Sequence, residues 1–494
     1  MKIKLDLSSL ASIPENVAVP AYDPKVLTPG ILHIGVGNFH RAHQAVYLDR
    51  LFNQGLDLDW GLIGAGIMSW DADMRKRLQR QDWLTTVVEL DDEGLTARVC
   101  AAMIDFVATQ PSSLIDALTR PEIRIVSLTI TEGGYFVDEK TGGVCFEHPD
   151  IAHDIAHPDT PITVFGILMA SLEKRRNSGH QPFTIMSCDN APDNGHMTRQ
   201  VLVGLAKLVN PDLAEWIEEV VAFPNSMVDC ITPATSKLEQ DKLANLFGIE
   251  DAAPVFCEPF RQWVLEDNFP QGRPALEKVG VEFVDDVTPY ELMKLRILNG
   301  GHAALAFPAA LMGLTYVHDA MSDSTILGYL ERIVRNEVIP TLAPLSGVSF
   351  DDYFTLIVRR FSNPEIGDTI ARLCRDSSSR LPKFIFPIIS DNVSSNTPCP
   401  GLTMVVAFWC LYCADSTHED SSVVLVDEHS ERLQSQATRA TRDPAVFLEM
   451  EDIFGALGGS SMFVDQFVQA MEAISKDGVS NTMENYMRSG DLVC

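Results

Sequence analysis

The sequence predicts an α/β protein with an N-terminal doubly wound sheet of Rossmann type and a mostly α-helical C-terminal domain. Three observations indicate this. Short apolar runs alternate with helical patterns in the first part of the chain, a glycine turn joins the first run to the first helix, and long helical patterns prevail from Pro289 onward. Such alternation of strand and helix is typical of a mostly parallel sheet with helices on both faces. We therefore expect a Rossmann-type NAD-binding domain over residues 1–287 and a helical substrate domain over residues 288–494.

The expected strands are short apolar or alternating runs, which is the pattern of buried and half-buried strands. They lie at residues 31–34, 60–67, 84–90, 96–106, 123–129 and 183–187. Helical periodicity separates several of them, at residues 40–53, 112–118 and 163–177. In the second part, helical patterns cover residues 289–307, 324–338, 351–360, 402–413, 443–454 and 460–475. The polar stretch 415–435 is expected to be an exposed loop or a disordered segment.

The composition is that of an ordinary globular protein with an unusual charge. The chain has 494 residues, of which 46% are hydrophobic and 21% charged, enough for two to three domains. The formal net charge of −30 argues against nucleic acids and anionic membranes as partners, because few cations are left to neutralise phosphates. No run reaches the roughly 18 apolar residues of a membrane span, and the N-terminus lacks a signal-peptide pattern. Ten scattered cysteines then predict reduced thiols in a cytoplasmic protein.

A glycine turn follows the first expected strand. Its sequence is Gly35-Val-Gly-Asn-Phe-His-Arg41, and it opens an expected helix, which is the context of a dinucleotide phosphate turn. Gly35 would permit the tight turn, and Gly37 would let the backbone approach a pyrophosphate, whose charge favours a helix N-terminus. The third glycine of the usual pattern is replaced by His40. The residues expected to bind the cofactor are Ile34, Gly35, Val36, Gly37, Asn38 and Phe39.

Two acidic residues, Asp71 and Asp73, follow the second expected strand. An acidic side chain at this point binds the ribose hydroxyls of NAD, whereas a cation would be needed for the extra phosphate of NADP. No Lys or Arg lies between Ile67 and Asp73, so we expect NAD as the cofactor, with Asp71 on the ribose. The alternative is that Asp71 only caps the helix that follows.

The run from Pro289 to His302 carries polar side chains at helical spacing. At about 100° per residue of an α-helix, Glu291, Lys294, Asn299 and His302 would fall within an arc of roughly 140°. A carboxylate, a base, an amide and an imidazole would then face one place. The alternative is an ordinary amphipathic helix with its polar face in water, which the two leucines inside the polar arc disfavour.

Four segments, in this order along the chain, resemble a single family. They are the glycine turn, Thr129-Ile-Thr-Glu-Gly-Gly-Tyr135, Ser187-Cys-Asp-Asn190 and the Lys294-x4-Asn299-x2-His302 pattern. Together they are similar to the polyol-specific long-chain dehydrogenase/reductase family, over nearly the whole chain. The resemblance implies a Rossmann-type domain, a mostly helical domain, an active site in the cleft between them, and hydride transfer without a metal.

The resemblance also implies a role for each matching residue. Lys294 would be the general base that takes the hydroxyl proton, and Asn190 and Asn299 would hold the developing oxyanion. His302 would position the substrate, and Glu291 would connect Lys294 to solvent. The positions at which the family contacts the polyol are matched by Asp229, Arg372 and Arg380, and the position associated with NAD preference is matched by Asp71.

These residue types suit the oxidation of a secondary alcohol. The hydroxyl proton needs a base that titrates near the working pH, so a lysine, ordinarily with a pKa of about 10.4, must be shifted downward by burial and by the positive nicotinamide ring. The alkoxide that forms needs fixed donors, and each amide donor typically contributes on the order of 3 kcal/mol. Two amides and a lysine can thus replace the zinc of other alcohol dehydrogenases.

The implied reaction is the reversible, NAD-dependent oxidation of a sugar alcohol to a ketose, with D-mannitol and D-fructose as the expected pair. D-arabinitol with D-xylulose, and mannonate with fructuronate, are alternatives within the family. Arg380 stands where mannitol-oxidising members tend to carry Lys, and the two cations differ in geometry. A uronate would need an additional cation, which Arg372, Arg380 or Lys383 could provide. A small-molecule polyol or ketose is the expected partner, and because bacterial members are often monomers, a monomer is expected.

Three other interpretations compete. Tyr290-x3-Lys294 matches the Tyr/Lys pair of short-chain dehydrogenases, but it lies far from the glycine turn in a chain that is long for that class. His33, His40 and His43 could suggest a metal site, although no further ligand is evident nearby. A dinucleotide-binding regulator without catalysis is the alternative of another class, and the intact polar residues of the Pro289 run argue against it.

Overall fold

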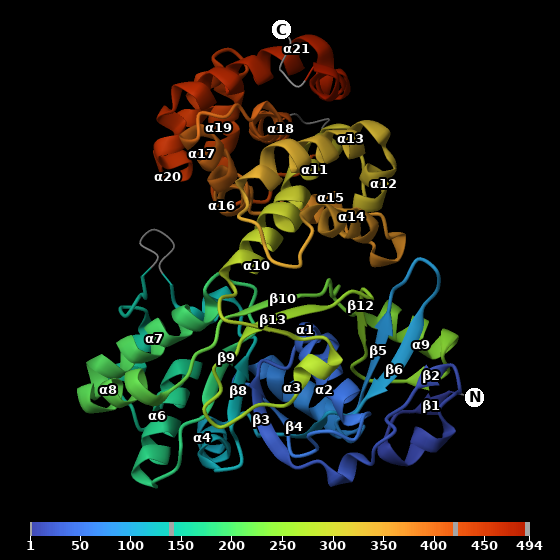
Figure 1. Ribbon diagram of the computed structural model, residues 1–494, viewed down its shortest axis with the longest axis vertical. Coiled ribbons are helices and arrows are strands. Elements are labelled where there is room, and N and C mark those ends of the chain that lie inside the picture. The colour runs from blue at the N-terminus through green and yellow to red at the C-terminus, as the bar shows by residue number, and fades with distance from the viewer. Residues whose placement is uncertain (1, 138–142, 418–422, 490–494) are drawn as a thin grey trace. The chain divides into compact units, whose positions relative to one another are not determined.

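The computed structural model describes residues 2–137, 143–417 and 423–489. The chain divides into two compact units, Met1–Thr288 and Pro289–Cys494, and each is described by itself (Figure 1). No helix among the described residues is long and apolar enough to cross a membrane.

A parallel five-stranded sheet forms the centre of the N-terminal unit. Its strands are β3 (Pro29–Ile34), β4 (Gly61–Ala65), β7 (Met103–Phe106), β8 (Ile125–Leu128) and β9 (Thr184–Ser187). They lie in the order β7-β4-β3-β8-β9, and every neighbouring pair is parallel. The order reverses between β3 and β8, which is the strand order of a Rossmann fold and the place where such sheets bind ligands. The predicted doubly wound sheet is confirmed.

Alternate side chains of these strands enter two separate cores. Leu32, Ile34 and Val126 pack with α4 (Pro111–Thr119), α6 (Val164–Asn177) and α7 (Asn194–Val209). Ile31 and Ile125 point to the other face and pack with α2 (Gln44–Phe52) and with strand β13 (Gln262–Glu266). The strands are buried on both faces, which explains why they read as continuous apolar runs in the sequence.

Smaller sheets complete this unit. A four-stranded sheet has the order β12-β5-β6-β2, formed by β12 (Val255–Cys257), β5 (Thr85–Glu89), β6 (Thr96–Cys100) and β2 (Val17–Ala18), and β13 lies between β10 (Ser226–Asp229) and β14 (Glu282–Val284). A further pair joins β1 (Ile3–Lys4) to β11 (Ile249–Glu250). The stretch 96–106 was expected to be one strand, but it is divided between β6 and β7, which belong to different sheets.

The remaining helices of the unit are mostly short. They are η1 (Leu7–Ser12), η2 (Pro24–Val26), α1 (Asn38–Ala42), α3 (Ser69–Gln79), η3 (Glu132–Tyr135), α5 (Pro149–Ala156), α8 (Pro211–Val220), α9 (Lys237–Leu246) and η4 (Leu276–Val279). The helix expected at 40–53 is interrupted at His43, whose φ of −115° and ψ of −89° lie outside the helical region.

Among its described residues, the C-terminal unit consists of helices joined by turns and loops, with an isolated bridge between Tyr316 and Thr369. Its first elements are α10 (Thr288–Met293), η5 (Lys294–Asn299), α11 (Gly300–Leu311), α12 (Val317–Ser322), α13 (Ser324–Ile333), η6 (Val334–Val338), η7 (Ile339–Thr341), α14 (Phe350–Phe361) and η8 (Pro364–Ile366). They are followed by α15 (Ile370–Leu373), α16 (Ser377–Phe384), α17 (Phe386–Ser394), α18 (Pro400–Asp415), α19 (Ser430–Ala440), η9 (Pro444–Glu449), α20 (Glu451–Phe454), η10 (Gly455–Gly459) and α21 (Ser461–Ser489). Helix α18 is buried over most of its length, and it packs against α11, α19 and α21.

The expectation of an exposed or disordered stretch at 415–435 is wrong in part. Residues 418–422 lie outside the described residues, but α19 begins at Ser430 and buries Leu433 and Ala437 one helical turn apart. The sequence did not indicate this helix, because its few apolar residues are widely spaced in a segment of mostly polar composition. Before the helix, Asp427 accepts hydrogen bonds from the Ser377 hydroxyl and from both the backbone and the hydroxyl of Ser378.

Candidate active site

The glycine turn lies at the carboxyl end of β3, beside the point where the strand order reverses. Gly35 has a φ of +100°, and a Cβ there would come within 2.1 Å of the Thr129 carbonyl oxygen, so only glycine fits. Gly37 is the N-cap of α1, and its N–H donates to the Gly35 carbonyl at 2.7 Å. A Cβ on Gly37 would meet only that carbonyl oxygen, at 3.9 Å. The turn therefore offers an open backbone surface that fits the pyrophosphate of a dinucleotide.

Polar side chains below the turn fix its shape. The buried His33 ring bonds to Ser127 Oγ at 2.8 Å, to Thr129 Oγ1 at 2.9 Å and to the Gly35 carbonyl oxygen at 3.1 Å. Ser127 Oγ in turn donates to Gln44 Oε1 at 2.9 Å. The His40 ring, at the position of the missing third glycine, stacks on His33 with 3.5 Å between ring centroids. Sequence reasoning did not identify this network, because its members come from β3, β8 and α2.

The side chains predicted to bind the cofactor are mostly engaged within the protein. Ile34 and Val36 are buried. The Asn38 amide donates to Pro233 O and Thr235 Oγ1, both at 3.3 Å, and its oxygen accepts from Arg41. Phe39 stacks on His43 at 4.8 Å. A cofactor at this turn would therefore meet mainly backbone groups.

Asp71 lies in the first turn of α3, close to the end of β4. Its carboxylate accepts from the Met68 N–H at 2.9 Å, and a Cβ on Gly66 would lie only 2.2 Å from its Cγ. Burial raises the pKa of Asp71, while hydrogen bonds from Met68 and Ile67 oppose that shift. Asp71 thus caps α3, as the alternative interpretation stated. It also lies at the end of the second strand, where a ribose ligand is expected. Asp73 is exposed and pairs with Lys76 at 3.4 Å.

Asn190 and Asp229 are placed at two strand ends of the same unit. Asn190 is exposed after β9, and Asp229 is buried as the last residue of β10. The residue before Asn190 was not predicted as a site residue. Asp189 accepts from the N–H groups of Ile130 and Thr131 at 3.0 and 2.8 Å.

Tyr135 completes this arrangement, since its hydroxyl donates to Asp189 at 2.8 Å and lies 2.7 Å from Ser187 Oγ. Two motifs that carried the family resemblance, 129–135 and 187–190, are therefore joined through one carboxylate. Asp189 could have been noticed in the sequence because it lies within the motif 187–190. Its hydrogen-bond partners could not, because they are more than 50 residues away in sequence.

In the C-terminal unit, the run from Pro289 to His302 is helical, but it is not a uniform α-helix. Residues Lys294–Asn299 form a π-helical segment, and the Gly300 N–H bonds to the Leu295 carbonyl five residues earlier. The prediction that this run is a uniform α-helix, on which the predicted arc was based, is therefore wrong. A π-turn is wider than an α-helical turn, with hydrogen bonds between residues five apart, so Lys294 and Asn299 lie closer to one face than an α-helix would place them. Such segments are rare and are frequent at functional sites.

The four predicted polar residues of this run differ in their environments. Glu291 and Lys294 are buried. Asn299 is half-buried, and its Oδ1 is shielded from solvent without a hydrogen bond to any described residue. The His302 ring stacks on Phe361 with 3.8 Å between centroids.

His302 is surrounded by cations of the same unit. Burial lowers its pKa well below the usual range, and the nearby guanidinium groups of Arg372, Arg380 and Arg360 act in the same direction. Of these, the buried Arg360 was not predicted. Arg372 binds Asp368 through Nε and Nη2 at 2.6 and 2.5 Å, and Arg380 donates to the Leu373 carbonyl at 3.0 Å. The imidazole is therefore neutral at physiological pH.

The histidines that could have suggested a metal site have other contacts. Both His33 nitrogens bond to Ser127, Thr129 and Gly35, and His43 Nε2 lies 2.9 Å from the Gln262 carbonyl oxygen. Within the ranges that the structure describes, no three His, Cys, Asp or Glu side chains gather as metal ligands would.

Comparison with known proteins gives full-length matches. Models of the mannitol dehydrogenase Rossmann domain and C-terminal domain match residues 29–278 and 286–475. The chain is 51% identical over 476 residues to a mannitol 2-dehydrogenase of Cereibacter sphaeroides, covering 96% of this chain and 99% of that protein. It is 43% identical to the structure of Pseudomonas fluorescens mannitol 2-dehydrogenase in ternary complex with NAD and D-mannitol, with a TM-score of 0.86, covering 99% of this chain and 100% of that one. A substrate-free D-sorbitol dehydrogenase matches at 34% identity and a TM-score of 0.90, covering 97% and 99% of the two chains.

These matches span both units, and they confirm the resemblance that the glycine turn and the three later motifs predicted. The chain belongs to the mannitol dehydrogenase family.

Proposed function

We propose that this protein is an NAD-dependent polyol dehydrogenase that interconverts D-mannitol and D-fructose. The observation that carries the proposal is the 51% identity to a mannitol 2-dehydrogenase over 99% of that enzyme's length. The glycine turn supports the choice of a dinucleotide cofactor, because Gly37 leaves an open backbone surface at the switch point of the sheet. Asp71 supports NAD over NADP, since it places a carboxylate close to the end of β4.

The residues of the Pro289 run would handle the proton and the oxygen of the substrate. NAD, when bound, accepts the hydride from the alcohol carbon. Lys294 takes the hydroxyl proton, and Glu291 passes it towards solvent. Glu291 lies three residues before Lys294 and on the same side of the helix. Asn299 is suited to bind the alkoxide because its side-chain NH2 group can donate a hydrogen bond. Its Oδ1, which makes no hydrogen bond within the described residues, can accept one from a substrate hydroxyl, and a buried polar group without a partner gains most from a ligand.

We assign the second amide donor to Asn190 and substrate positioning to His302, Asp229, Arg372 and Arg380. A neutral imidazole can accept or donate one hydrogen bond at each ring nitrogen, which suits a polyol hydroxyl. The pairing of Arg372 with Asp368 through two hydrogen bonds favours a neutral polyol over a uronate, because the charge of this arginine is already matched.

A cytoplasmic location and a monomeric state belong to the same proposal. Support for the former comes from the nine cysteines in the described part of the chain, which are all unpaired, with eight of them buried, as expected for reduced thiols. Small polyols and ketoses are the proposed partners, and the net charge of −30 disfavours nucleic acids.

The test is a substrate panel with purified protein. D-mannitol, D-sorbitol, D-arabinitol and mannonate are each supplied with NAD and with NADP, and formation of the reduced cofactor is followed by absorbance. The reverse reaction uses fructose and fructuronate with NADH. We expect D-mannitol with NAD to give the highest kcat/KM. Faster turnover of D-sorbitol, D-arabinitol or mannonate would reassign the substrate, and no turnover of any pair would refute the enzymatic function.

A further inference from the structure

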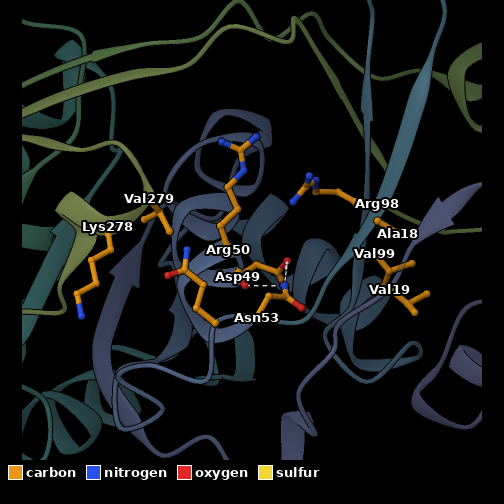
Figure 2. A pocket seen from close by; sticks show the side chains of 10 residues that line it. Ala18, Val19, Asp49, Arg50, Asn53, Arg98, Val99, Lys278 and Val279 are labelled. Atoms are coloured by element: carbon orange, nitrogen blue, oxygen red, sulfur yellow. Dashed lines mark hydrogen bonds between the residues drawn. The ribbon is translucent and has the colours of Figure 1, made fainter.

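A second pocket lies in the N-terminal unit, away from the glycine turn. It has a volume of about 460 Å³, within the range of small-molecule sites of about 300–1,000 Å³. It lies where the C-terminal part of α2 meets β2, β6 and η4 (Figure 2). The residues that line it are Ala18, Val19, Asp49, Arg50, Asn53, Gln54, Arg98, Val99, Lys278 and Val279.

Three of the lining side chains are cations from three different elements. Arg50 comes from α2, Arg98 from β6 and Lys278 from η4. Within the described ranges, neither Arg98 nor Lys278 makes a side-chain hydrogen bond or an ion pair. Figure 2 shows the guanidinium groups of Arg50 and Arg98 extending into the same part of the view. In a chain with a net charge of −30, such a concentration of positive charge is unusual.

The acidic partner of Arg50, Glu89, also pairs with another arginine. Glu89 Oε1 lies 2.7 Å from Nη1 of Arg261, whose side chain is 1% exposed, but 3.7 Å from Nη2 of Arg50. Glu89 therefore interacts more strongly with Arg261 than with Arg50, because electrostatic interaction strengthens with proximity and burial. Arg50 is therefore only partly neutralised by Glu89.

The carboxylate of Asp49, which also lines the pocket, is held by donors of the protein. It accepts hydrogen bonds from the Tyr22 hydroxyl at 2.8 Å, from the Ala101 N–H at 3.1 Å and from the Asn53 amide at 3.0 Å. Burial raises the pKa of Asp49. Its charge is thus enclosed by donors on the protein side, as the dashed contacts in Figure 2 indicate for Asn53.

The guanidinium groups of Arg50 and Arg98 are also close enough to repel one another. The pKa of Arg50 is lowered first by burial and then by Arg261 and Arg98. Like charges held together in this way raise the free energy of the empty pocket, and a bound anion would relieve that repulsion. The apolar surfaces of Val19, Val99 and Val279 beside the cations could contact the uncharged body of a ligand.

From this arrangement we propose that the pocket binds the phosphate group of a small phosphorylated molecule. The two guanidinium groups suit a phosphate monoester, which carries about −1.5 to −2 charges at neutral pH, because arginine binds phosphate through two parallel hydrogen bonds. Lys278, whose ammonium group points to the other side in Figure 2, adds positive charge at the edge of the pocket. This site is separate from the proposed cofactor site, because none of its lining residues belongs to the glycine turn, to α3 or to the ends of β3, β8 and β9.

Titration calorimetry of the full-length protein at low ionic strength tests the proposal, with inorganic phosphate, pyrophosphate and malonate as probes. We expect one phosphate or pyrophosphate per chain at this site, with malonate weaker. Arg50→Gln combined with Arg98→Gln should weaken binding about a hundredfold or more, because each charge-assisted hydrogen bond contributes about tenfold or more. Lys278→Glu reverses an exposed charge and should weaken binding in a protein of unchanged thermal stability, which separates loss of the site from misfolding.

The matched control is Arg80→Gln combined with Arg442→Gln. Both side chains are exposed, they make no ion pair within the described residues, and the pair changes the net charge by the same amount. This control should bind phosphate as the wild type does. NADH should bind the Arg50/Arg98 variant with unchanged affinity, so that loss of this site is distinguishable from loss of the cofactor site.

Three results would overturn the proposal. The first is that wild-type protein binds neither phosphate nor pyrophosphate. The second is that the Arg50/Arg98 variant and the control bind phosphate equally, with NADH displacing it, which would place the phosphate at the glycine turn. The third is tighter binding of malonate than of pyrophosphate, which would assign the pocket to carboxylates instead.

Discussion

Asn299 follows Lys294 by one turn of the π-helical segment η5. An α-helix would place these two residues about 140° apart around its axis, because five residues at about 100° each exceed one turn. A π-turn is wider and brings residues five apart closer to one face. The two groups to which we assign proton removal and alkoxide binding thus leave the helix on the same face. The irregular backbone, and not only the order of the residues, brings the base and the amide together.

Replacing Lys294 by Ala should reduce kcat/KM for D-mannitol by about 10²–10⁴-fold, the usual contribution of a general base. An added small primary amine should restore part of the activity, because it can fill the space and accept the proton. Tyr290→Phe is the matched control, since it removes the hydroxyl of the competing Tyr/Lys interpretation, and it should leave kcat/KM nearly unchanged. If Tyr290→Phe abolished turnover and Lys294→Ala did not, the base would have to be reassigned.

Asp71→Asn should shift the cofactor preference towards NADP. The asparagine keeps an oxygen for the Met68 N–H, so the start of α3 should persist, but the negative charge that repels an extra phosphate is lost. We expect the ratio of kcat/KM for NADP to that for NAD to rise about tenfold or more, which corresponds to about 1.4 kcal/mol. Asp73→Asn removes the same charge from an exposed position. An equal shift in both variants would indicate a general electrostatic effect and not ribose recognition.

His302→Phe separates the packing role of this residue from its hydrogen-bonding role. A phenyl ring can keep the stack on Phe361 while it loses both nitrogens. Loss of one hydrogen bond to a substrate hydroxyl, at about 1–3 kcal/mol, should lower kcat/KM for D-mannitol about 10–100-fold, with little change in melting temperature. Because the pKa of His302 is depressed, the wild-type pH profile should show no ionisation of this ring near pH 6.5. An unchanged kcat/KM in His302→Phe would remove His302 from the proposed site.

The sequence revealed those features that depend on local pattern. The strands β3, β4, β8 and β9 were predicted because burial on both faces leaves continuous apolar runs, and the glycine turn was predicted because a positive φ at Gly35 demands a particular residue. Features that depend on tertiary contacts were not predictable in this way. The π-helical segment at Lys294 uses ordinary helix-forming residues, and nothing in its composition distinguishes five-residue from four-residue hydrogen bonding.

The candidate site shows the same division. Its chemically active residues were recognisable from motif spacing, and their roles stay predictions until they are tested. The groups that hold them in place were not recognised. Asp189 reaches partners more than 50 residues earlier, and Arg360 acts on His302 from a separate helix. Such contacts exist only once the chain has folded.

Asp189→Asn should impair catalysis although Asp189 itself does not touch substrate. The carboxylate accepts from two N–H groups and one hydroxyl, and an amide would turn a donor towards one of them, at a cost of about 1–3 kcal/mol. We expect a lower melting temperature, and a larger change in kcat than in KM, because the neighbouring Asn190 would be displaced. Tyr135→Phe removes one of these donors and should have a smaller effect. Unchanged kcat in Asp189→Asn would show that this carboxylate does not position Asn190.

The stacked pair His33 and His40 should make the N-terminal unit sensitive to acid. Burial lowers the pKa of His33 to about 3 and lowers that of His40 well below its usual range. Below about pH 6.5 these two histidines bind protons in the unfolded chain but not in the folded chain. The free energy of unfolding therefore falls as the pH falls. At pH 5 the His33 ring should cost about 2 kcal/mol relative to pH 8, and His40 should act in the same direction.

The variant His40→Phe tests this effect with little change in shape. Both nitrogens of His40 are buried without a hydrogen bond to a described residue, so a phenyl ring should keep the stack on His33 and remove an unsatisfied donor. Urea unfolding at pH 5 and pH 8 should show a higher free energy of unfolding for the variant at both values and a smaller difference between them. His157→Phe, at an exposed histidine, should leave the pH dependence as in the wild type. If His40→Phe unfolded with the wild-type pH dependence, His40 would have to be protonated in the folded protein, and the neutral stack beneath the glycine turn would be wrong.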